Sequence, residues 1–316
     1  MANSQTAIVT GGAGFIGSHL VDSLLGDGHR VVVVDDLSTG RASNLQSGAE
    51  LAPVDITDAN ALDEVFDSAR PERVFHLAAQ STVTVSVKDP ARDCEVNVRG
   101  TLNVLEAAGR HDAPVVFTST GGALYGEGVP LPAPESQSPA PLSPYGASKW
   151  AAEAYVRTWS LASGIPHAVC RLGNVYGPRQ NPHGEAGVVS IFTRLLWEGQ
   201  APTLFGFGDA TRDYVHVHDV VACLRAASGT EGVFNVATSV ETSVRDVFRI
   251  LREESRVNVN PVLAPLREGE LTRSCLDPAL ARRVLGWKPS IPIQRGMRST
   301  YHELVAEFEA EVESCR

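Results

Sequence analysis

In the first half of the chain, short apolar runs rich in β-branched residues alternate with segments whose apolar positions recur every three or four residues. The runs show no apolar–polar alternation, and Val31–Val34 is the clearest case, as is typical of strands buried on both faces of a parallel sheet. This order of elements predicts an α/β fold with a doubly wound parallel sheet. The predicted strands are Thr6–Thr10, Arg30–Asp35, Glu50–Asp55, Arg73–Ala78, Pro114–Ser119 and His167–Leu172.

Helices are predicted where apolar positions repeat at helical spacing. Gly14–Gly26 places its apolar residues on one face, and the segment from Val98 to Gly109 does the same. After Gly173 the pattern is less regular. The helices predicted there are Val188–Trp197, Val220–Ala227, Ser243–Glu254 and a C-terminal one from about Ile293.

A proline-rich stretch separates two of these elements. Val129–Pro144 holds six of the 19 prolines, so it can be neither a helix nor a central strand. Its last two residues have a clearer meaning, because Ser143 is a good helix N-cap and Pro144 suits the first helical position. We therefore expect a helix from here to about Ala162.

Composition and charge limit the class of protein. Of the 316 residues, 43% are apolar and 20% are charged, so the chain can bury a sizeable core. The formal net charge of −10 argues against nucleic acid or an anionic membrane as a partner. No apolar run approaches the ~18 residues of a membrane helix, and no basic segment opens the chain. We expect a cytoplasmic protein without membrane spans.

The cysteines and histidines form no metal-binding pattern. The five cysteines are widely spaced, with no C-x-x-C pair, which favours reduced structural thiols over disulfides or a zinc site (Cys94, Cys170, Cys223, Cys275 and Cys315). His76, His216 and His218 lack an accompanying carboxylate or thiol pattern. We expect no metal.

A glycine triplet lies where the first predicted strand turns into the first helix. Gly11, Gly14 and Gly17 form G-x-x-G-x-x-G. The first glycine permits a tight turn, the second lets the backbone approach a pyrophosphate, and the third lets helix and strand pack closely. The helix N-terminus adds free N–H groups and a positive dipole end. Any tight strand-to-helix turn could use such glycines, so the triplet alone is a weak signal.

Asp35, 24 residues beyond Gly11 and after the second strand, strengthens the dinucleotide interpretation. A carboxylate there accepts hydrogen bonds from ribose hydroxyls and repels a 2′-phosphate. The alternative is a simple turn residue beside Asp36. Together with the glycines, the position predicts NAD rather than NADP as cofactor.

Tyr145 and Lys149 are four residues apart at the start of the proline-capped helix, so they share one face. A tyrosine has a pKa near ~10 and is a poor base at neutral pH. A nearby ammonium, or a positively charged nicotinamide ring, stabilises the phenolate and lowers that pKa. Ser119 and Thr120 end the fifth strand, where ligands bind in open α/β sheets, and their hydroxyls could bridge the tyrosine and a substrate. The alternative readings are an exposed helical pair and ordinary turn residues.

The sequence resembles the extended short-chain dehydrogenase/reductases, and within them most of all the UDP-glucose 4-epimerases and closely related nucleotide-sugar epimerases. The resemblance covers nearly the whole chain. The motifs that carry it are T-G-G-A-G-F-I-G (10–17), Asp35, Asp55-Ile56, H-L-A-A-Q (76–80), V-N-V-R-G-T (96–101), S-T-G-G-A-L-Y-G (119–126), S-P-Y-G-A-S-K (143–149), R-L-G-N-V-Y-G-P-R-Q (171–180), G-D-A-T-R-D-Y-V-H-V-H-D-V (208–220) and R-E-G-E-L (267–271).

The resemblance implies a Rossmann-type NAD-binding domain, which we place at 1–172, and a smaller mixed α/β nucleotide-sugar domain at 173–316, from which some segments return to the first. It also implies a homodimer joined through a helix bundle, and a UDP-sugar as substrate.

The resemblance implies roles for individual residues. Tyr145 would be the base, Lys149 its electrostatic partner and ribose ligand, and Thr120, with Ser119 beside it, the assisting hydroxyl. The implied cofactor-binding residues are Gly11, Gly14, Phe15, Ile16, Gly17, Asp35, Asp36, Asp55, Ile56, Leu77, Ala78, Ala79, Gln80, Asn97 and Lys149. The implied substrate-binding residues are Thr120, Tyr145, Asn174, Arg179, Arg212, Arg267 and Glu270, with Arg212 and Arg267 clamping the pyrophosphate.

Departures from related enzymes narrow the reaction. Where dehydratases and decarboxylases of this superfamily carry acidic residues after the threonine, this chain has Gly121 and Gly122, which can donate no proton. Ser274 falls near a position where a bulky residue restricts some epimerases to unacetylated sugars, so an N-acetyl group has room here. The segment after Arg179, Gln180–Glu185, lacks the stretch typical of uronate epimerases, although Arg179 could still bind a uronate carboxylate.

The leading hypothesis is NAD-dependent 4-epimerisation of a UDP-hexose, with UDP-glucose and UDP-galactose favoured, through a transient 4-keto sugar. UDP-N-acetylglucosamine or UDP-glucuronate 4-epimerisation, or another nucleotide-sugar modification, are alternatives within enzymes. A non-catalytic NAD sensor is disfavoured because Tyr145, Lys149 and Thr120 occur together.

Overall fold

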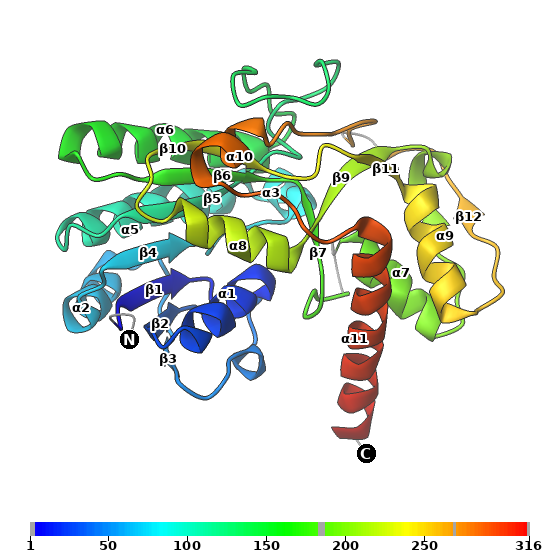
Figure 1. Ribbon diagram of the computed structural model, residues 1–316, viewed down its shortest axis with the longest axis horizontal. Coiled ribbons are helices and arrows are strands. Elements are labelled where there is room, and N and C mark those ends of the chain that lie inside the picture. The colour runs from blue at the N-terminus through cyan, green and yellow to red at the C-terminus, as the bar shows by residue number, and fades with distance from the viewer. Residues whose placement is uncertain (1–3, 183–186, 268–269, 315–316) are drawn as a thin grey trace.

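A seven-stranded parallel sheet forms the centre of the computed structural model, which describes residues 4–182, 187–267 and 270–314. Cys315 and the part of Gln180–Glu185 beyond residue 182 lie outside the described residues. The strand order is β10-β6-β5-β4-β1-β2-β3 (Figure 1). The strands are β1 (Thr6–Thr10), β2 (Arg30–Val34), β3 (Ala49–Ala52), β4 (Arg73–His76), β5 (Val115–Thr120), β6 (Ala168–Leu172) and β10 (Gly232–Val236). The predicted α/β fold with a doubly wound parallel sheet is confirmed.

Three of the predicted strands end earlier than expected. β2 stops at Val34, and β3, which pairs Ala52 with Val34, stops with it. β4 pairs His76 with Thr10 and ends where β1 turns into the glycine loop. Each strand therefore ends where its neighbour leaves the sheet, which the hydrophobic pattern of a single segment cannot reveal.

The sheet is covered by helices on both faces. Helices α1 (Phe15–Gly26), α8 (Val217–Ala227) and α10 (Ala279–Leu285) pack on one face, and α2 (Ala59–Ala69), α5 (Gly100–Gly109) and α6 (Pro144–Ser163) on the other. Val31 and Val33 belong to the first core, whereas Val32 and Val34 belong to the second. A continuous valine run thus serves two cores, because successive side chains of a strand point to opposite faces.

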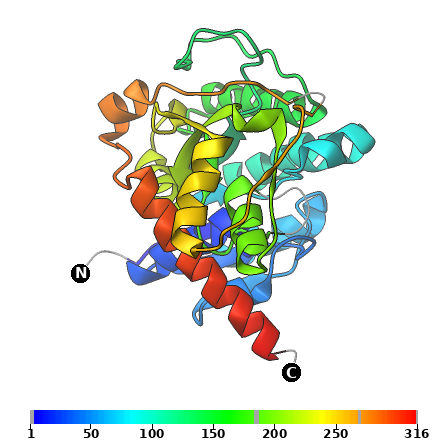
Figure 2. The ribbon, with the colours of Figure 1, turned by 90° about the vertical axis from the view of Figure 1, so that its right-hand side faces the viewer.

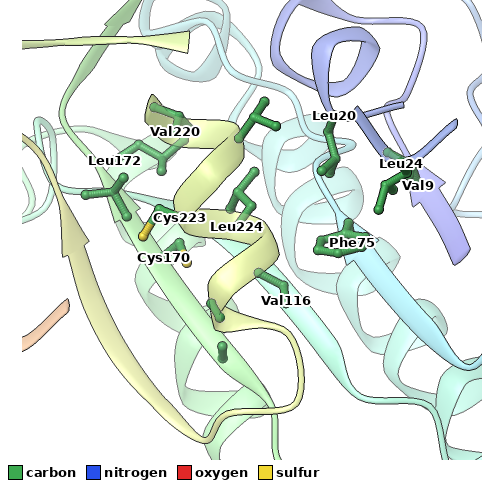
Figure 3. Close-up of a cluster of buried hydrophobic side chains, with 14 of the residues drawn as sticks. Val9, Leu20, Leu24, Phe75, Val116, Cys170, Leu172, Val220, Cys223 and Leu224 are labelled. Carbon is green, nitrogen blue, oxygen red and sulfur yellow. The ribbon is translucent and has the colours of Figure 1, made fainter. Parts of the chain in front are cut away.

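Figure 3 shows part of the first core, where Leu20 and Leu24 of α1 and Val220 and Leu224 of α8 lie on the sheet. Burial of each such side chain contributes about 1.5–3 kcal/mol. α8 and β10 follow residue 172 in the chain yet pack on this sheet, β10 pairing with β6 at its edge. The boundary between the two domains stays a prediction.

A second, smaller group of elements lies beside the sheet. It contains the three-stranded sheet β11-β9-β7, in which β9 runs parallel to β7 and antiparallel to β11, and the pair β8–β12. Helices α7, α9 and α11, which lie side by side in Figure 2, share a hydrophobic core separate from the two cores of the large sheet. These elements are β7 (Asn174–Tyr176), β8 (Thr203–Leu204), β9 (Thr211–His216), β11 (Glu241–Ser243), β12 (Val262–Leu263), α7 (Val188–Trp197), α9 (Val244–Ser255) and α11 (Ile293–Ser314).

Capping explains where two helices begin. α8 starts three residues earlier than predicted, at Val217, because the His216 ring accepts a hydrogen bond from the His218 N–H (3.2 Å). α6 begins at Pro144 as predicted, with the Ser143 hydroxyl accepting from the Gly146 N–H at 3.2 Å. Among the described residues, no helix is long and apolar enough to cross a membrane.

The helix predicted from Val98 begins as an α-helix only at Gly100. A π-helical turn, η2 (Glu95–Arg99), precedes it and presents Asn97 toward α6, where its amide contacts Ser148. Such turns are rare and frequent at functional sites. The remaining short elements are α3 (Val83–Lys88), α4 (Pro90–Cys94) and the 3₁₀ turns η1 (Ala42–Asn44) and η3 (Phe205–Gly208).

Candidate active site

The glycine loop between β1 and α1 is a close-packed cradle. A Cβ on Gly17 would lie 2.1 Å from the Gly11 carbonyl oxygen, and one on Gly11, whose φ is +70°, would lie 2.6 Å from the Ala78 nitrogen. Gly14 is the N-cap of α1 and has no side chain to occupy the first N–H groups of the helix, of which Phe15 and Ile16 form the first turn. A bare helix N-terminus in a tight glycine turn suits an anionic diphosphate.

Asp35 ties the end of β2 to this loop. Its carboxylate accepts hydrogen bonds from the N–H groups of Ala13 and Leu37, each at 2.9 Å. Burial raises the pKa of this carboxyl, although both hydrogen bonds act in the opposite direction. Each carboxylate oxygen keeps acceptor capacity for a further donor. Its neighbour Asp36 is exposed and caps the Ser38 N–H (3.0 Å), so only Asp35 adjoins the glycine loop.

The segment after β4 forms a second wall beside the glycines. The Leu77 N–H donates to the Thr10 carbonyl (3.0 Å), and the Ala78 N–H donates to the Thr10 hydroxyl (3.2 Å). Asn97 holds Gln80 by a pair of hydrogen bonds, each of 2.9 Å, between its side chain and the Gln80 backbone. The stretch Leu77–Gln80, with Ala79 in it, is therefore fixed against the loop from two sides.

Asp55 and Ile56 lie in the turn after β3. Asp55 accepts from the Thr57 N–H (2.9 Å) and lies 3.6 Å from the Arg92 guanidinium. Ile56 is buried against Gly100, where a Cβ would come 2.5 Å from the Ile56 Cδ1. The structure thus places both residues on the α5 side of the sheet, near the carboxyl ends of its strands.

Tyr145 and Lys149 lie in the first two turns of α6, and both contact residues of neighbouring elements. The Tyr145 N–H donates to the Ser86 hydroxyl (3.1 Å), and the Tyr145 hydroxyl is hydrogen-bonded to Thr120. The Lys149 side chain is buried, with Nζ 4.2 Å from the centre of the Phe117 ring. The structure brings these two residues and the end of β5 together, in keeping with the sequence pattern.

The protonation chemistry of the pair differs from the sequence-based expectation. Burial raises the pKa of Tyr145 to about 12, where a lowered value was expected. Burial lowers the pKa of Lys149 to about 7, against the opposing charges of Glu153 and Asp93. In both residues the loss of hydration on burial disfavours the charged form and is the largest cause of the shift.

Ser119, Thr120 and the two glycines after them form the turn at the end of β5. The Ser119 hydroxyl is buried and has no hydrogen-bond partner among the described residues, and Thr120 also accepts from the Ala123 N–H (3.2 Å). Asn174 at the start of β7 lies across the turn, its amide oxygen 3.4 Å from a Cβ placed on Gly122. Thr120, Tyr145 and Asn174 therefore border the same region.

A residue that sequence reasoning missed closes this turn. A Cβ on Gly121 would lie 2.3 Å from Cδ1 of Leu276, so Leu276 fills the space that a larger residue at position 121 would need. Leu276 follows Ser274, whose N–H donates to the Thr211 carbonyl (3.1 Å). The contact joins segments 155 positions apart, and no local signal in the sequence indicates it.

The predicted substrate-binding arginines lie in different surroundings. Arg212 is on β9, next to Thr211 and hence to the Ser274 segment. Arg267 is half exposed, 3.9 Å above the Phe205 ring and 3.7 Å from the Glu270 carboxylate. Residues 268 and 269 between them lie outside the described residues.

Arg179 points elsewhere. The Arg179 guanidinium pairs with Asp22 of α1 at 2.7 Å. The backbone N–H of Arg179 donates to the Glu307 carboxylate of α11 (3.1 Å). Its contacts with α1 and α11 join the sheet to the C-terminal helices. The structure does not bring Arg179 to Tyr145.

Three further buried charges, Arg171, Glu153 and Asp93, went unnoticed in the sequence. Arg171 on β6 makes a bidentate pair with Glu153 of α6, at 2.6 and 3.0 Å. Asp93 is a buried residue of α4, which packs against α6. Glu153 follows Lys149 by four residues, so helical spacing could have found it. Among the described residues, Cys94, Cys170, Cys223 and Cys275 are free thiols, and no three potential ligands gather as a metal site would require.

Comparisons with known proteins agree with this geometry. Residues 7–237 match the family described as the NAD dependent epimerase/dehydratase family. A UDP-glucose 4-epimerase of Mycolicibacterium smegmatis is 45% identical over 302 residues, covering 93% of this chain and 96% of that protein.

Two solved structures are also similar. The UDP-glucose 4-epimerase of Thermotoga maritima, solved with UDP-glucose, has a TM-score of 0.93 at 42% identity, covering 96% of this chain and 99% of that one. The UDP-glucose 4-epimerase of Thermus thermophilus, solved with NAD, has a TM-score of 0.89 at 42% identity, covering 95% and 98%. The chain belongs to the NAD-dependent epimerase/dehydratase family, a branch of the extended short-chain dehydrogenase/reductases.

Proposed function

We propose that this protein is an NAD-dependent enzyme that interconverts UDP-glucose and UDP-galactose by inversion at carbon 4 of the hexose. The observation that carries the proposal is the hydroxyl of the half-buried Tyr145, hydrogen-bonded to Thr120 at the carboxyl end of β5 and one helical turn from Lys149. The chain is also 42–45% identical, over nearly its whole length, to proteins named UDP-glucose 4-epimerase.

The cofactor cradle fits NAD. The bare N-terminus of α1 at Gly14 would hold the pyrophosphate, Asp35 would accept from a ribose hydroxyl, and Asp55 and Ile56 would flank the adenine. Leu77–Gln80, Asn97 and Lys149 would line the rest of the channel. When bound, NAD supplies a reversible hydride acceptor for the carbon that bears the reacting hydroxyl.

Tyr145 is the proposed base. As a phenolate, its oxygen takes the proton of the sugar 4-hydroxyl while carbon 4 is oxidised to a ketone. The same oxygen returns the proton when carbon 4 is reduced from the opposite face. Thr120 orients the phenol through their hydrogen bond, and the Lys149 ammonium favours the phenolate electrostatically. Because burial, together with the charge of Asp93, raises the pKa of Tyr145 to about 12, the positive charge of Lys149 and of the bound cofactor has to favour ionisation strongly.

The substrate is held by its UDP part. Arg212 and Arg267 are proposed to bind the diphosphate, Asn174 to contact it near the sugar, and Glu270 to reach the uridine ribose. Firm binding of the diphosphate with few contacts to the hexose lets the keto sugar turn over without leaving. Arg179 is not part of this proposal, since its guanidinium is paired with Asp22.

The turn after Thr120 argues against dehydration or decarboxylation. Neither Gly121 nor Gly122 can transfer a proton, and Leu276 fills the space beside Gly121. An acidic side chain introduced at position 121 would collide with Leu276. The pocket is therefore suited to oxidation and reduction at one carbon without a second acid or base from this turn.

The proposal includes a homodimer in the cytoplasm. Trp150 and Leu161 of α6 are 45% and 80% exposed and, eleven residues apart, lie on one helical face. Helix α3, which packs against α6, carries Val87, which is 63% exposed. The free thiols of the four described cysteines suit a reducing compartment. Sedimentation of the purified protein should give the mass of two chains, and Trp150→Lys should shift it to one; a wild-type monomer would refute the dimer.

Product analysis tests the function. The protein is incubated separately with UDP-glucose, UDP-N-acetylglucosamine and UDP-glucuronate, and the epimers are separated by chromatography. We expect the conversion of UDP-glucose to UDP-galactose to be the fastest of the three reactions. Tyr145→Phe should lower the rate of this reaction at least ~10³-fold while NAD remains bound. Faster conversion of either other sugar would reassign the substrate, and full activity of Tyr145→Phe would remove the proposed base.

A further inference from the structure

A buried carboxylate beside the Tyr145–Lys149 pair has a role still to be explained. Asp93 of α4 is 1% exposed. Its Oδ1 accepts from the Gln80 Nε2 (2.8 Å) and the Asn97 Nδ2 (3.2 Å), whereas its buried Oδ2 has no hydrogen-bond partner among the described residues. A buried carboxylate oxygen without a donor is unfavourable unless a nearby charge compensates it.

The compensating charge is supplied by α6, against which α4 packs. The charge of Asp93 raises the pKa of Lys149 and also that of Tyr145, so its carboxylate is electrostatically coupled to both members of the pair. Gln80 and Asn97, which fix the carboxylate, also form the wall beside the glycine loop. Asp93 therefore connects the cofactor wall with the catalytic helix.

The other charged groups around Lys149 are accounted for. Glu153, one turn further along α6, acts on Lys149 but is neutralised by its bidentate contact with Arg171 of β6. His76 of β4 is hydrogen-bonded to Thr10 and Thr101 and, because burial lowers its pKa to about 3, is uncharged at neutral pH. Unlike Glu153, Asp93 forms no ion pair with an arginine or lysine within 4 Å among the residues that the structure describes.

We propose that Asp93 is a positioning residue for the reaction, whose buried negative charge keeps Lys149 in its ammonium form and sets the pH range in which the Tyr145–Lys149 pair operates. This inference rests on the proposed function of the pair. Asp93 touches neither the reacting atoms nor the proposed substrate contacts; it acts through Lys149 and Tyr145.

Removal of the Asp93 charge and removal of the Glu153 charge should change the pH profile of the reaction in different ways. Loss of the Asp93 charge disfavours the ammonium and favours the phenolate, so both pKa values fall. Both limbs of the pH profile should then move to lower pH. Loss of the Glu153 charge acts on Lys149 and should move one limb only. A purely structural defect would lower the rate without moving either limb.

The first measurement is the pH profile of kcat/KM for UDP-glucose, with NAD in excess. Asp93→Asn keeps the acceptor oxygen for Gln80 and Asn97, and Asp93→Ser serves as a second variant in case the amide is not tolerated. Glu95→Gln, exposed and two residues away, is the matched control for the loss of one charge. In the Asp93 variants we expect both limbs of the pH profile to move to lower pH by about one unit. In Glu153→Gln only one limb should move, and in Glu95→Gln neither limb should move.

A second measurement does not need activity. Only three lysines occur in the chain, and Lys88 and Lys288 are exposed, so the amines can be titrated individually by NMR after lysine labelling, with Lys149→Arg for assignment. Asp93→Asn should lower the titration midpoint of Lys149 by about one pH unit. An unchanged midpoint together with unmoved limbs would overturn the role of Asp93. Retained epimerisation by Tyr145→Phe would instead refute the proposed function, leaving the lysine titration as an independent result.

Discussion

At the scale of single residues, Gly17 and Gly14 of the loop are glycines for different reasons. Gly17 is required by the fold itself, because its Cβ position lies 2.1 Å from the backbone oxygen of Gly11. Gly14 has more room, since its Cβ would come 3.2 Å from the same oxygen, and its φ of −79° suits any residue. The spacing in the sequence does not distinguish these two requirements.

The first prediction follows from that difference. Gly17→Ala should lower the melting temperature of the ligand-free protein by several degrees, because α1 has to move away from β1 to relieve the clash. Gly14→Ala should leave the ligand-free protein nearly as stable but weaken NAD binding at least ~10-fold, since a methyl group covers the helix N-terminus. Differential scanning calorimetry and NAD titration measure the two effects, and equal melting of both variants would contradict the assignment.

At the scale of elements, one buried ion pair joins α6 to the sheet. Arg171 of β6 donates to Glu153 of α6 and, through Nη1, to the Tyr125 hydroxyl at 2.8 Å. Both charges are removed from water, so neither tolerates the loss of its partner. The pair thereby fixes the helix that carries Tyr145 and Lys149 against β6.

The second prediction concerns this pair. Arg171→Met or Glu153→Leu alone should reduce the free energy of unfolding by about 3–5 kcal/mol, whereas the double variant should recover much of the loss. The exposed Arg30–Glu50 pair is the control: Glu50→Ala should cost less than about 1 kcal/mol despite a contact of 2.7 Å. Urea unfolding measures all four variants. Additive losses in the double variant would show that the two charges are not coupled.

At the scale of the whole molecule, buried histidines tie stability to pH. Burial lowers the pKa of His76 to about 3 and that of His19, His167 and His216 to about 4, against an ordinary value of 6.5. Between these values the unfolded chain binds more protons than the native one, so stability falls as the pH falls from 6.5 toward 4. Asp35 and Asp213, whose pKa values burial raises, act in the opposite direction nearer the ordinary carboxyl range.

The third prediction concerns how strongly the free energy of unfolding depends on pH through these histidines. Each buried histidine should cost about 1.4 kcal/mol per pH unit within that window. Urea unfolding between pH 7.5 and 5.5 should show the loss, and His167→Asn should remove one histidine's share of the slope. His302, which is exposed, provides the control variant His302→Gln, with an unchanged slope. If all three proteins lose stability equally, the histidines are not responsible.

Several features of the site could be predicted from local patterns. The strands are found because β-branched runs bury both faces, the start of α6 because Ser143 and Pro144 cap it, and the glycine loop because strand and helix meet there. The placing of Thr120 beside Tyr145 also follows, since the carboxyl ends of parallel strands share one edge. The exact ends of β3 and β4 do not follow, because they depend on where the neighbouring strand stops.

The sequence alone thus determined the fold class, the family resemblance, the cofactor cradle and the Tyr145–Lys149 pair, because each rests on residues close together in the chain or on rules that hold for every parallel sheet. Only the tertiary structure decided that Arg179 binds Asp22, that Leu276 closes the turn at Gly121, and that the charge of Asp93 acts on Lys149. It also decided that the pKa of Tyr145 rises, because burial depends on how distant segments pack and no local pattern records it.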